Sequence, residues 1–545
     1  MRQRSRRFPS ATVAALAVVV ALAVVAGCSD RGAGKRSARR ATTSTTATTT
    51  DAAEAGAPGV GDPYFAEAGN GGYDVQSYEL VIALEKTDGP IDASTTIRAK
   101  STQALSSFDL DLHALEVHSI EVDGKAAKYT REGDELVVTP AKPIASGAEF
   151  TTLVRYGGVP EGVLDPSFPI PIHLGWMAKN GEVYVVSEPT GAKSFFPCND
   201  HPRDKALYTF RITVPKPLDV VANGKLAETI DGSEKRTFVY KPRDPIATYL
   251  VTIAIAPFET SDLAGPNGLP IRNYFSPQTK ANARKGFERT DAIVQFLSET
   301  FGPYPFEVCG NILSSIELPG ALETQTLPTY GAHAASEDVI AHELAHQWFG
   351  DSVSVENWQD IWLNEGFAEY ASWMYSEATH GKDAEERKAK FEKLLRSNYG
   401  SIRAMGSRTP REGDDAAKKA QAEPPPGSPS VKSLFGPNVY IRGALALHAL
   451  RTEVGDESFL KLMRSWAAGR KNGNASVADF ANHVEKSTSK AARALLEHWI
   501  NDAEMPHVAA WDEALAKDKA ERDAKKKARE EKRKSDEGGE KKDGG

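Results

Sequence analysis

The residues with the clearest chemical potential form the pattern His342-Glu343-Leu-Ala-His346, in a stretch with helical periodicity. Side chains four positions apart lie on one face of a helix, so both imidazoles can be directed at one metal ion. A third candidate ligand, Glu365, follows after eighteen intervening residues, near the start of another expected helix. Two histidines and one glutamate are a ligand set of catalytic zinc sites that leave one position open. The spacing predicts one Zn²⁺ ion held by His342, His346 and Glu365.

Glu343 lies beside the expected metal, where its carboxylate would act as the general base on zinc-bound water. The same group would then protonate the departing amine, which completes the hydrolysis of a peptide bond. A simpler interpretation is that the histidines are core or surface groups and that Glu365 only places favourable charge at a helix N-terminus. The two histidines and Glu365 occur together at the spacing of a zinc site, and this combination favours the metal site over the simpler interpretation.

Further motifs around this pattern are similar to those of one known family. Glu365 lies within Trp-Gln-Asp-Ile-Trp-Leu-Asn-Glu-Gly-Phe-Ala, and Gly320-Ala321-Leu-Glu323-Thr precedes the expected zinc helix. Upstream, Pro-Cys198-Asn-Asp lies late in a region of alternating apolar residues. Together these motifs resemble the gluzincin zinc aminopeptidases, the family that includes aminopeptidase N and leukotriene hydrolase. The resemblance covers about residues 70 to 510.

The resemblance implies roles for residues outside the metal site. Tyr440, in a Tyr-Ile-Arg-Gly segment, would donate a hydrogen bond to the negatively charged oxygen that forms during attack. Glu323 and Glu188 would bind the ammonium group of a free peptide N-terminus, which places the first peptide bond over the metal. Gly320 and Ala321 would contact the substrate as part of the same motif. The implied partners are therefore peptides with a free N-terminus.

Three positions need separate comment. Thr324 replaces the Asn of the family motif, which could change the geometry around Glu323, and Arg442 stands where the family has Lys. Glu369, one helical turn after Glu365, either orients a zinc-binding imidazole or belongs to a polar helix face.

The resemblance ends near Trp511, before the large helical domain that covers the cleft in the family. We therefore expect a more open cleft.

Two other functions are consistent with parts of the sequence. A thermolysin-like metalloendopeptidase would share the zinc ligands and the base, but it has no use for Glu188 and Glu323 as a pair. A lipid-anchored binding module with a relict zinc site is the alternative from outside the enzymes. The complete set of ligands, base and Tyr440 argues against a relict site, because such a site needs none of them.

The N-terminus predicts export and a lipid anchor. Four arginines within residues 1–7 precede an apolar run over residues 11–26. This run is shorter than a typical transmembrane helix, and the sequence Val-Ala-Gly-Cys28 ends it. This pattern is typical of a lipoprotein signal peptide, residues 1–27, whose cleavage leaves Cys28 as the lipidated first residue. The expected location is outside the cytoplasm, attached to the bacterial cell membrane. An uncleaved anchor with a chance cysteine is the alternative. Residues 28–69 are rich in Thr and Ala and predict a disordered tether.

Apolar periodicity divides the remaining chain into two domains and a tail. Period-two runs, such as 78–84, 149–156 and 249–255, predict an all-β antiparallel domain over 70–260. Helical periodicity in 281–301, 339–349, 362–379 and 440–454 predicts a thermolysin-like, mainly helical α+β domain over 261–512. Residues 513–545 contain almost only charged and small residues and predict a charged disordered tail, in part a solvated helix.

Composition excludes several other classes. The 545 residues are 40% hydrophobic and 26% charged, which rules out a fully disordered or multi-pass membrane protein. A net charge of −8 argues against nucleic acid as the main partner. Only three cysteines are present, so no disulfide framework supports the fold. After lipidation of Cys28, Cys198 and Cys309 would either pair or stay as buried free thiols.

Overall fold

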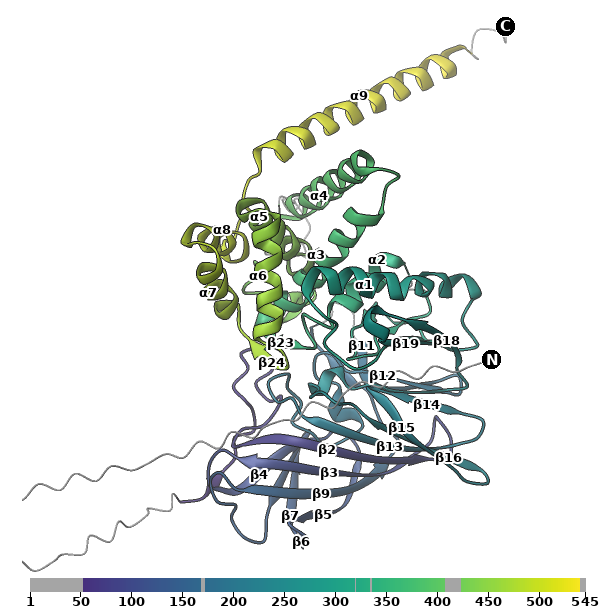
Figure 1. Cartoon of the computed structure of the whole chain (residues 1–545), viewed down its shortest axis with the longest axis vertical. Helices are drawn as coiled ribbons and strands as arrows, with labels where there is room; N and C mark the ends of the chain where they lie inside the picture. Colours follow the sequence, from purple (N-terminus) through teal and green to yellow (C-terminus); the bar gives the residue numbers. More distant parts are fainter. Residues whose placement is uncertain (1–51, 168–171, 319, 334–335, 407–422, 540–545) are drawn as a thin grey trace, which may run out of the picture. The chain divides into compact units, whose positions relative to one another are not determined.

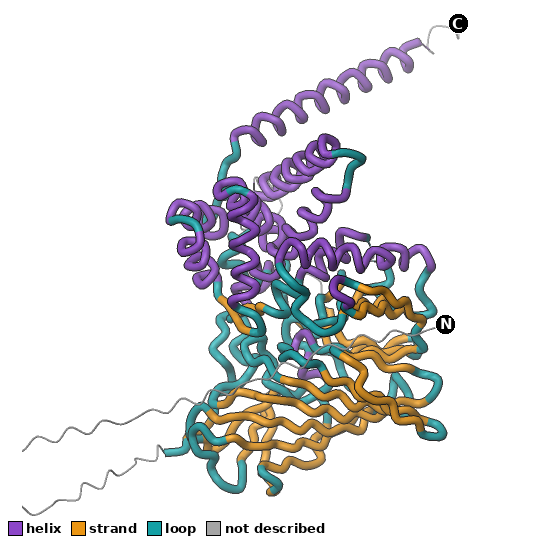
Figure 2. Tube along the Cα trace, in the orientation of Figure 1, coloured by secondary structure: helices purple, strands orange, loops and turns teal. Residues whose placement is uncertain are grey.

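The computed structural model describes residues 52–167, 172–318, 320–333, 336–406 and 423–539. In these residues the strands gather in one part and the helices in another (Figures 1 and 2). The expected signal peptide, Cys28 and the first part of the expected tether lie outside the described residues. Within the described residues, no helix is both long and apolar enough to cross a membrane.

The largest sheet of the N-terminal region has eight strands in the order β15-β16-β13-β2-β3-β9-β5-β6. Buried and exposed positions alternate along β2 and β9, because one face of the sheet packs on the core. The pair of β2 and β13 departs from the antiparallel pattern, since the two strands run parallel. The strands are β2 (Tyr73–Leu84), β3 (Ile91–Ser101), β5 (Glu116–Val122), β6 (Lys125–Ala126), β9 (Glu149–Gly158), β13 (Leu207–Pro215), β15 (Lys225–Asp231) and β16 (Lys235–Lys241).

Two smaller sheets complete this region. The five-stranded sheet has the order β10-β11-β12-β17-β14, and its strands β12 and β17 are buried throughout. The four-stranded sheet has the order β1-β4-β8-β7. The strands are β1 (Glu54–Ala55), β4 (Leu105–Asp111), β7 (Lys128–Glu132), β8 (Glu135–Thr139), β10 (Val163–Asp165), β11 (Ile172–Lys179), β12 (Glu182–Val186), β14 (Asp219–Ala222) and β17 (Ile253–Ala256).

The second region begins with a mixed sheet in the order β18-β19-β20-β22-β21, so β21 forms an edge. Helices follow, with one short parallel pair of β23 and β24 between them. The strands are β18 (Glu259–Ala264), β19 (Pro270–Phe275), β20 (Cys309–Leu313), β21 (Ala321–Leu322), β22 (Thr329–Tyr330), β23 (Val353–Val355) and β24 (Gly473–Ala475). The helices are α1 (Thr290–Phe301), α2 (Glu337–Ala345), α3 (Trp362–Thr379), α4 (Ala384–Gly406), α5 (Gly443–Val454), α6 (Asp456–Gly469), α7 (Val477–Ser487), α8 (Lys490–Asn501) and α9 (Ala509–Gly539).

Several expected elements differ in their bounds. The expected helix over 281–301 is a 3₁₀ segment to Arg289 followed by α1, and the expected strand over 249–255 begins only at Ile253. The expected tether is ordered from residue 52, because β1 pairs with β4 and Asp62 is buried. The sequence predicts a tail over 513–545 that is disordered and in part a solvated helix, and its residues 513–539 belong to α9. Trp511, which precedes the tail in the same helix, packs on Tyr399 of α4.

Cys198 and Cys309 are both buried free thiols. Burial raises the pKa of each thiol, to about 12 for Cys309, so both stay protonated and unreactive at neutral pH. The alternative of a disulfide between them is therefore wrong.

Candidate zinc and peptide site

Helix α2 carries the central motif and is defined at both ends. Ser336 caps its N-terminus by accepting a hydrogen bond from the Val339 N–H at 3.3 Å. The helical turn continues through His346, whose N–H bonds the His342 carbonyl at 3.3 Å. Gly350 then ends the turn with a φ of 131°, and a Cβ there would lie 3.1 Å from His346 Nδ1. Glycine therefore permits both the backbone turn and the close approach to the imidazole.

Three ligand atoms converge at one point between α2 and α3. The Nε2 atoms of His342 and His346 are 3.1 Å apart, and each lies 3.3 Å from Glu365 Oε2. Tetrahedral bonds of about 2.0–2.1 Å to zinc would separate ligand atoms by about 3.3–3.4 Å. The three side chains therefore fit a zinc ion with a fourth position open, as the sequence predicted.

The second nitrogen of each imidazole has an acceptor. His342 Nδ1 lies 3.2 Å from Glu369 Oε2, and His346 Nδ1 lies 3.0 Å from the Phe349 carbonyl. The Trp373 indole donates to the other Glu369 oxygen at 2.8 Å and fixes this carboxylate. Protons on both Nδ1 atoms leave both Nε2 lone pairs free for a metal. Glu369 is thus placed to orient an imidazole of the candidate zinc site, whereas the sequence could not separate this role from that of a polar helix face.

Glu343 is buried, lines the cleft and is not one of the three converging ligands. Burial raises the pKa of its carboxyl to about 7, while His342 and His346 act in the opposite direction. A general base is most effective when its pKa lies near the working pH. The position and environment of Glu343 therefore suit proton transfer beside the ligands.

Tyr440 is presented by a π-helical turn, η8 (Asn438–Arg442), which leads directly into α5. Its ring stacks on the His342 ring, with 5.9 Å between centroids and an interplanar angle of 20°. The turn approaches α3 closely because two glycines meet: a Cβ on Gly366 would lie 3.1 Å from the Gly443 Cα. Burial and the Glu365 carboxylate hold the pKa of Tyr440 well above its ordinary value, so its hydroxyl remains a donor.

Arg442, in place of the family's Lys, points away from the cleft. Its buried guanidinium donates to the Trp499 carbonyl at 2.7 Å and the Asp502 carbonyl at 2.5 Å, with longer contacts to the next two carbonyls. Burial lowers its pKa to about 10, so it is charged at neutral pH. Arg442 therefore joins the turn that presents Tyr440 to the C-terminal end of α8.

Glu188 and Glu323 are buried carboxylates on the cleft wall beside the metal ligands. Ligand-type atoms of Glu323, Glu343 and His346 lie within 4.8 Å of one another. Oε1 of Glu188 and Oε1 of Glu323 are buried without a hydrogen-bond partner. Burial raises the pKa of both carboxyls, and for Glu188 the charge of Glu323 adds to this rise. Two such carboxylates form a site for a cation, which would restore their ionised forms.

Two neighbours of Glu323 explain how its loop is held. Gln347, directly after the second histidine, donates to the Glu323 carbonyl at 3.0 Å and accepts from the Thr326 N–H at 2.7 Å. Thr324 bonds the Leu327 carbonyl and the Thr329 hydroxyl inside the following turn. Thr324 therefore closes the turn and does not line the cleft. The sequence did not identify Gln347 as a residue that supports the site, although its position directly after His346 could have indicated this role.

The ligands, Glu343, Tyr440 and both carboxylates share one cleft of about 880 Å³. Gly320 and Ala321 line it at the edge strand β21, and Leu174 contributes from β11 of the N-terminal region. Among the described residues that line it, seven are Asp or Glu, whereas the basic residues are Lys432 and the two histidines of the candidate metal site. The negative potential of such a cleft attracts positively charged ligands at low salt.

The fold and the three converging ligands define a metallopeptidase of the two-histidine, one-glutamate zinc class. The chain belongs to the M1 family of zinc metallopeptidases. A model of the peptidase M1 N-terminal domain matches residues 75–250, and a model of the peptidase family M1 domain matches residues 321–499. The expected family is thereby confirmed.

Known structures and relatives agree with this assignment. An M1 zinc metallopeptidase from Deinococcus radiodurans, solved as a mutant bound to a Tyr-Ser-Ala substrate, is 30% identical with a TM-score of 0.73; the match covers 82% of this chain and 99% of that one. Yeast LTA4 hydrolase shares the fold at 21% identity, with a TM-score of 0.66, over 82% of this chain and 70% of that one. Rat (Rattus norvegicus) glutamyl aminopeptidase is 28% identical over 59% of this chain but only 34% of its own length. The chain thus spans about a third of that relative.

Proposed function

We propose that this protein is a zinc aminopeptidase that removes N-terminal residues from peptides. The observation that carries the proposal is the pair of Glu188 and Glu323, each of which has a buried oxygen without a hydrogen-bond partner and lines the cleft with the zinc ligands. A free peptide N-terminus is an ammonium group, and it would supply the missing hydrogen-bond donors and the opposite charge. An endopeptidase has no such group to place there.

Each of these residues has a separate role in the reaction. When bound by His342, His346 and Glu365, zinc supplies a Lewis acid that polarises the scissile carbonyl and acidifies water. Glu343 accepts a proton at its carboxylate from the attacking water and passes it to the departing amine. The Tyr440 hydroxyl donates to the carbonyl oxygen as negative charge develops there.

Binding of the amino end fixes the point of cleavage. Glu188 and Glu323 would hold the ammonium in the same cleft as the zinc ligands, which sets the position of the amino end relative to the metal. The first peptide bond is then the one that reaches Glu343 and Tyr440. Acetylation of the N-terminus removes the charge and two of the donors, so it should abolish productive binding.

The test compares a free tripeptide with its N-acetylated form. We expect cleavage of the free peptide only, and release of its first residue, measured by mass spectrometry. For Glu323→Gln we expect kcat/KM to fall about 10- to 100-fold, because a charge-assisted hydrogen bond contributes roughly 1.5–3 kcal/mol. Glu317→Gln is the matched control, since Glu317 is exposed, pairs with the exposed His333 and is not among the described residues that line the cleft. Equal cleavage of the acetylated peptide would contradict the aminopeptidase assignment.

We further propose that the enzyme is a lipoprotein outside the cytoplasm, attached to the bacterial cell membrane through Cys28. The basic start, the short apolar run and Val-Ala-Gly-Cys28 support this proposal. Expressed in a bacterial host, the wild-type protein should enter the detergent phase on phase separation. Cys28→Ser should move to the aqueous phase with unchanged activity, and an unchanged partition of this variant would disprove lipidation.

A further inference from the structure

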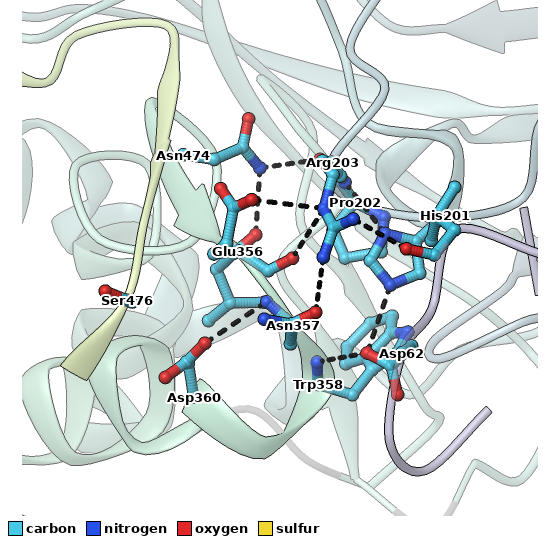
Figure 3. A network of polar contacts seen from close by, with 12 residues as sticks. Asp62, His201, Pro202, Arg203, Glu356, Asn357, Trp358, Asp360, Asn474 and Ser476 are labelled. Carbon is cyan, nitrogen blue, oxygen red and sulfur yellow. Dashed lines mark hydrogen bonds and ion pairs between the residues drawn. The ribbon is translucent and has the colours of Figure 1, made fainter. Parts of the chain in front are cut away.

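The segment before β2 packs between the two regions of the chain. We call residues 52–72 the strap. Its Asp62 side chain is fully buried and lies between His201, which follows the Pro-Cys-Asn-Asp motif, and Trp358, which precedes α3 (Figure 3). The expected tether thus includes a segment that contacts both the N-terminal sheets and the zinc domain.

Four hydrogen bonds converge on the Asp62 carboxylate. One oxygen accepts from the N–H groups of Tyr64 and Phe65, at 2.7 and 3.0 Å. The other accepts from His201 Nε2 at 3.1 Å and from the Trp358 N–H at 2.8 Å. Burial alone would raise the pKa of this carboxyl, but the bonds from His201 and Trp358 hold it below its ordinary value. Asp62 is therefore an ionised acceptor with every oxygen in use.

The tautomer of His201 follows from its two neighbours. Its Nδ1 accepts from the Arg203 N–H at 3.1 Å, so the ring proton sits on Nε2 and is donated to Asp62. Burial also lowers the pKa of His201, which keeps the ring neutral. An asparagine at position 62 would have to direct its NH₂ group at one of the two pairs of N–H donors. An NH₂ group cannot accept hydrogen bonds from these donors.

Trp358 connects this carboxylate to the metal site. It begins the 3₁₀ turn η5 (Trp358–Asp360), which runs into α3 and the zinc ligand Glu365. The Trp358 ring makes edge contacts with Phe65 of the strap at 6.1 Å and with Tyr249 at 5.2 Å. Asn364, the residue before Glu365, donates to the Tyr249 hydroxyl at 3.3 Å. The backbone bond and the ring contacts together set where α3 begins.

Arg203 adds a second connection along the same turn. Its guanidinium donates to the Val60 carbonyl of the strap at 2.8 Å. The same group donates to Asn357 Oδ1 (Figure 3). It also pairs with the Glu356 carboxylate at 3.1 Å. The strap is thus bonded to three consecutive residues, 356–358, directly or through Arg203.

We propose that Asp62 is a positioning residue for the zinc ligand Glu365, acting through the Trp358 N–H and the start of α3. The inference deepens the proposed function because it concerns the same site. It predicts that loss of the carboxylate weakens zinc binding and lowers kcat, while the sites for the peptide amino end stay intact and KM changes little.

The test measures zinc affinity by competition with a chelator, on the full chain, well below the unfolding temperature. For Asp62→Asn we expect affinity to fall by on the order of tenfold, as for other partners that orient metal ligands. Asp134→Asn is the matched control: Asp134 also accepts from a histidine, His113 at 2.7 Å, and it pairs with Lys193 of the N-terminal region at 3.0 Å. This control should lose thermal stability and keep its zinc affinity.

Unchanged zinc affinity in folded Asp62→Asn, or an equal loss in both variants, would overturn the proposal. If Asp62→Asn does not unfold cooperatively, Asp62→Glu replaces it, because this change keeps the charge but lengthens the side chain and moves the acceptor relative to the Trp358 N–H. Folded Asp62→Glu should lower zinc affinity by a smaller factor, and wild-type affinity would count against the proposal. Zinc affinity does not depend on peptide cleavage, so failure of the aminopeptidase assignment would be seen separately.

Discussion

Glu343→Gln should lower kcat by roughly 10²- to 10⁴-fold, the range that a positioned general base contributes. The amide keeps the shape of the side chain but cannot accept and return a proton. Zinc content should equal that of the wild type, because the three converging ligands do not include Glu343. Steady-state kinetics on a free tripeptide, with metal measured on the same samples, gives both quantities.

Glu337→Gln is the control for this change. Glu337 lies on the same helix α2, outside the cleft, and accepts a hydrogen bond from Tyr375 at 3.1 Å. This variant should keep its activity within a factor of about two. A Glu343→Gln protein with full zinc content and near-normal kcat would show that another group serves as the base.

Removal of a zinc ligand should abolish activity and also lower stability. In His346→Ala the metal retains only two protein ligands, and Glu365 loses one of its two histidine partners. A ligand that binds only the folded state stabilises it by about 4 kcal/mol at a thousandfold excess over its Kd. The wild type should therefore melt at a lower temperature when a chelator is added, whereas His346→Ala should not respond to chelator or zinc. Thermal denaturation monitored by circular dichroism measures this, and a variant that still responds to zinc would contradict the ligand assignment.

The stabilisation by zinc should also grow with pH. In the metal-free site, burial acts to lower the pKa of His342, but hydrogen bonds with Glu365 and Glu369 dominate and raise it well above its ordinary value. A raised folded-state pKa stabilises the metal-free protein below the unfolded pKa near 6.5, and this contribution is lost as pH rises through the folded-state pKa. Zinc must displace that proton, so the difference in melting temperature between zinc-loaded and metal-free protein should increase from pH 6 to pH 8.

The metal ligands could be predicted because their geometry is local. His342 and His346 are fixed by helical spacing, and Glu365 by a second helix that the sequence also indicates. Tyr440, Glu188 and Glu323 were accessible only through the family resemblance, since one tyrosine or glutamate carries no signal of its own. Tyr440 lies in a π-helical turn, and apolar periodicity in the sequence does not distinguish such a turn from an α-helix.

The parts that could not be predicted depend on contacts distant in the chain. The parallel pairing of β2 with β13 joins segments more than a hundred residues apart, and alternation within each strand does not select a partner. The strap is rich in Ala and Gly and has no apolar periodicity, so the sequence indicated disorder as far as residue 69. Its order comes from single buried groups, such as Asp62, whose partners lie at His201 and Trp358.

Arg442 makes the cleft sensitive to the length of the chain that follows α8. Its guanidinium takes the main-chain carbonyls of Trp499 and Asp502 as acceptors, and a lysine has only one nitrogen to offer them. Side-chain substitutions at residues 499–504 keep these acceptors, whereas an insertion or deletion there would move them and leave a buried guanidinium without partners. The length of this connection is therefore the property that must be preserved if Tyr440 is to keep its place.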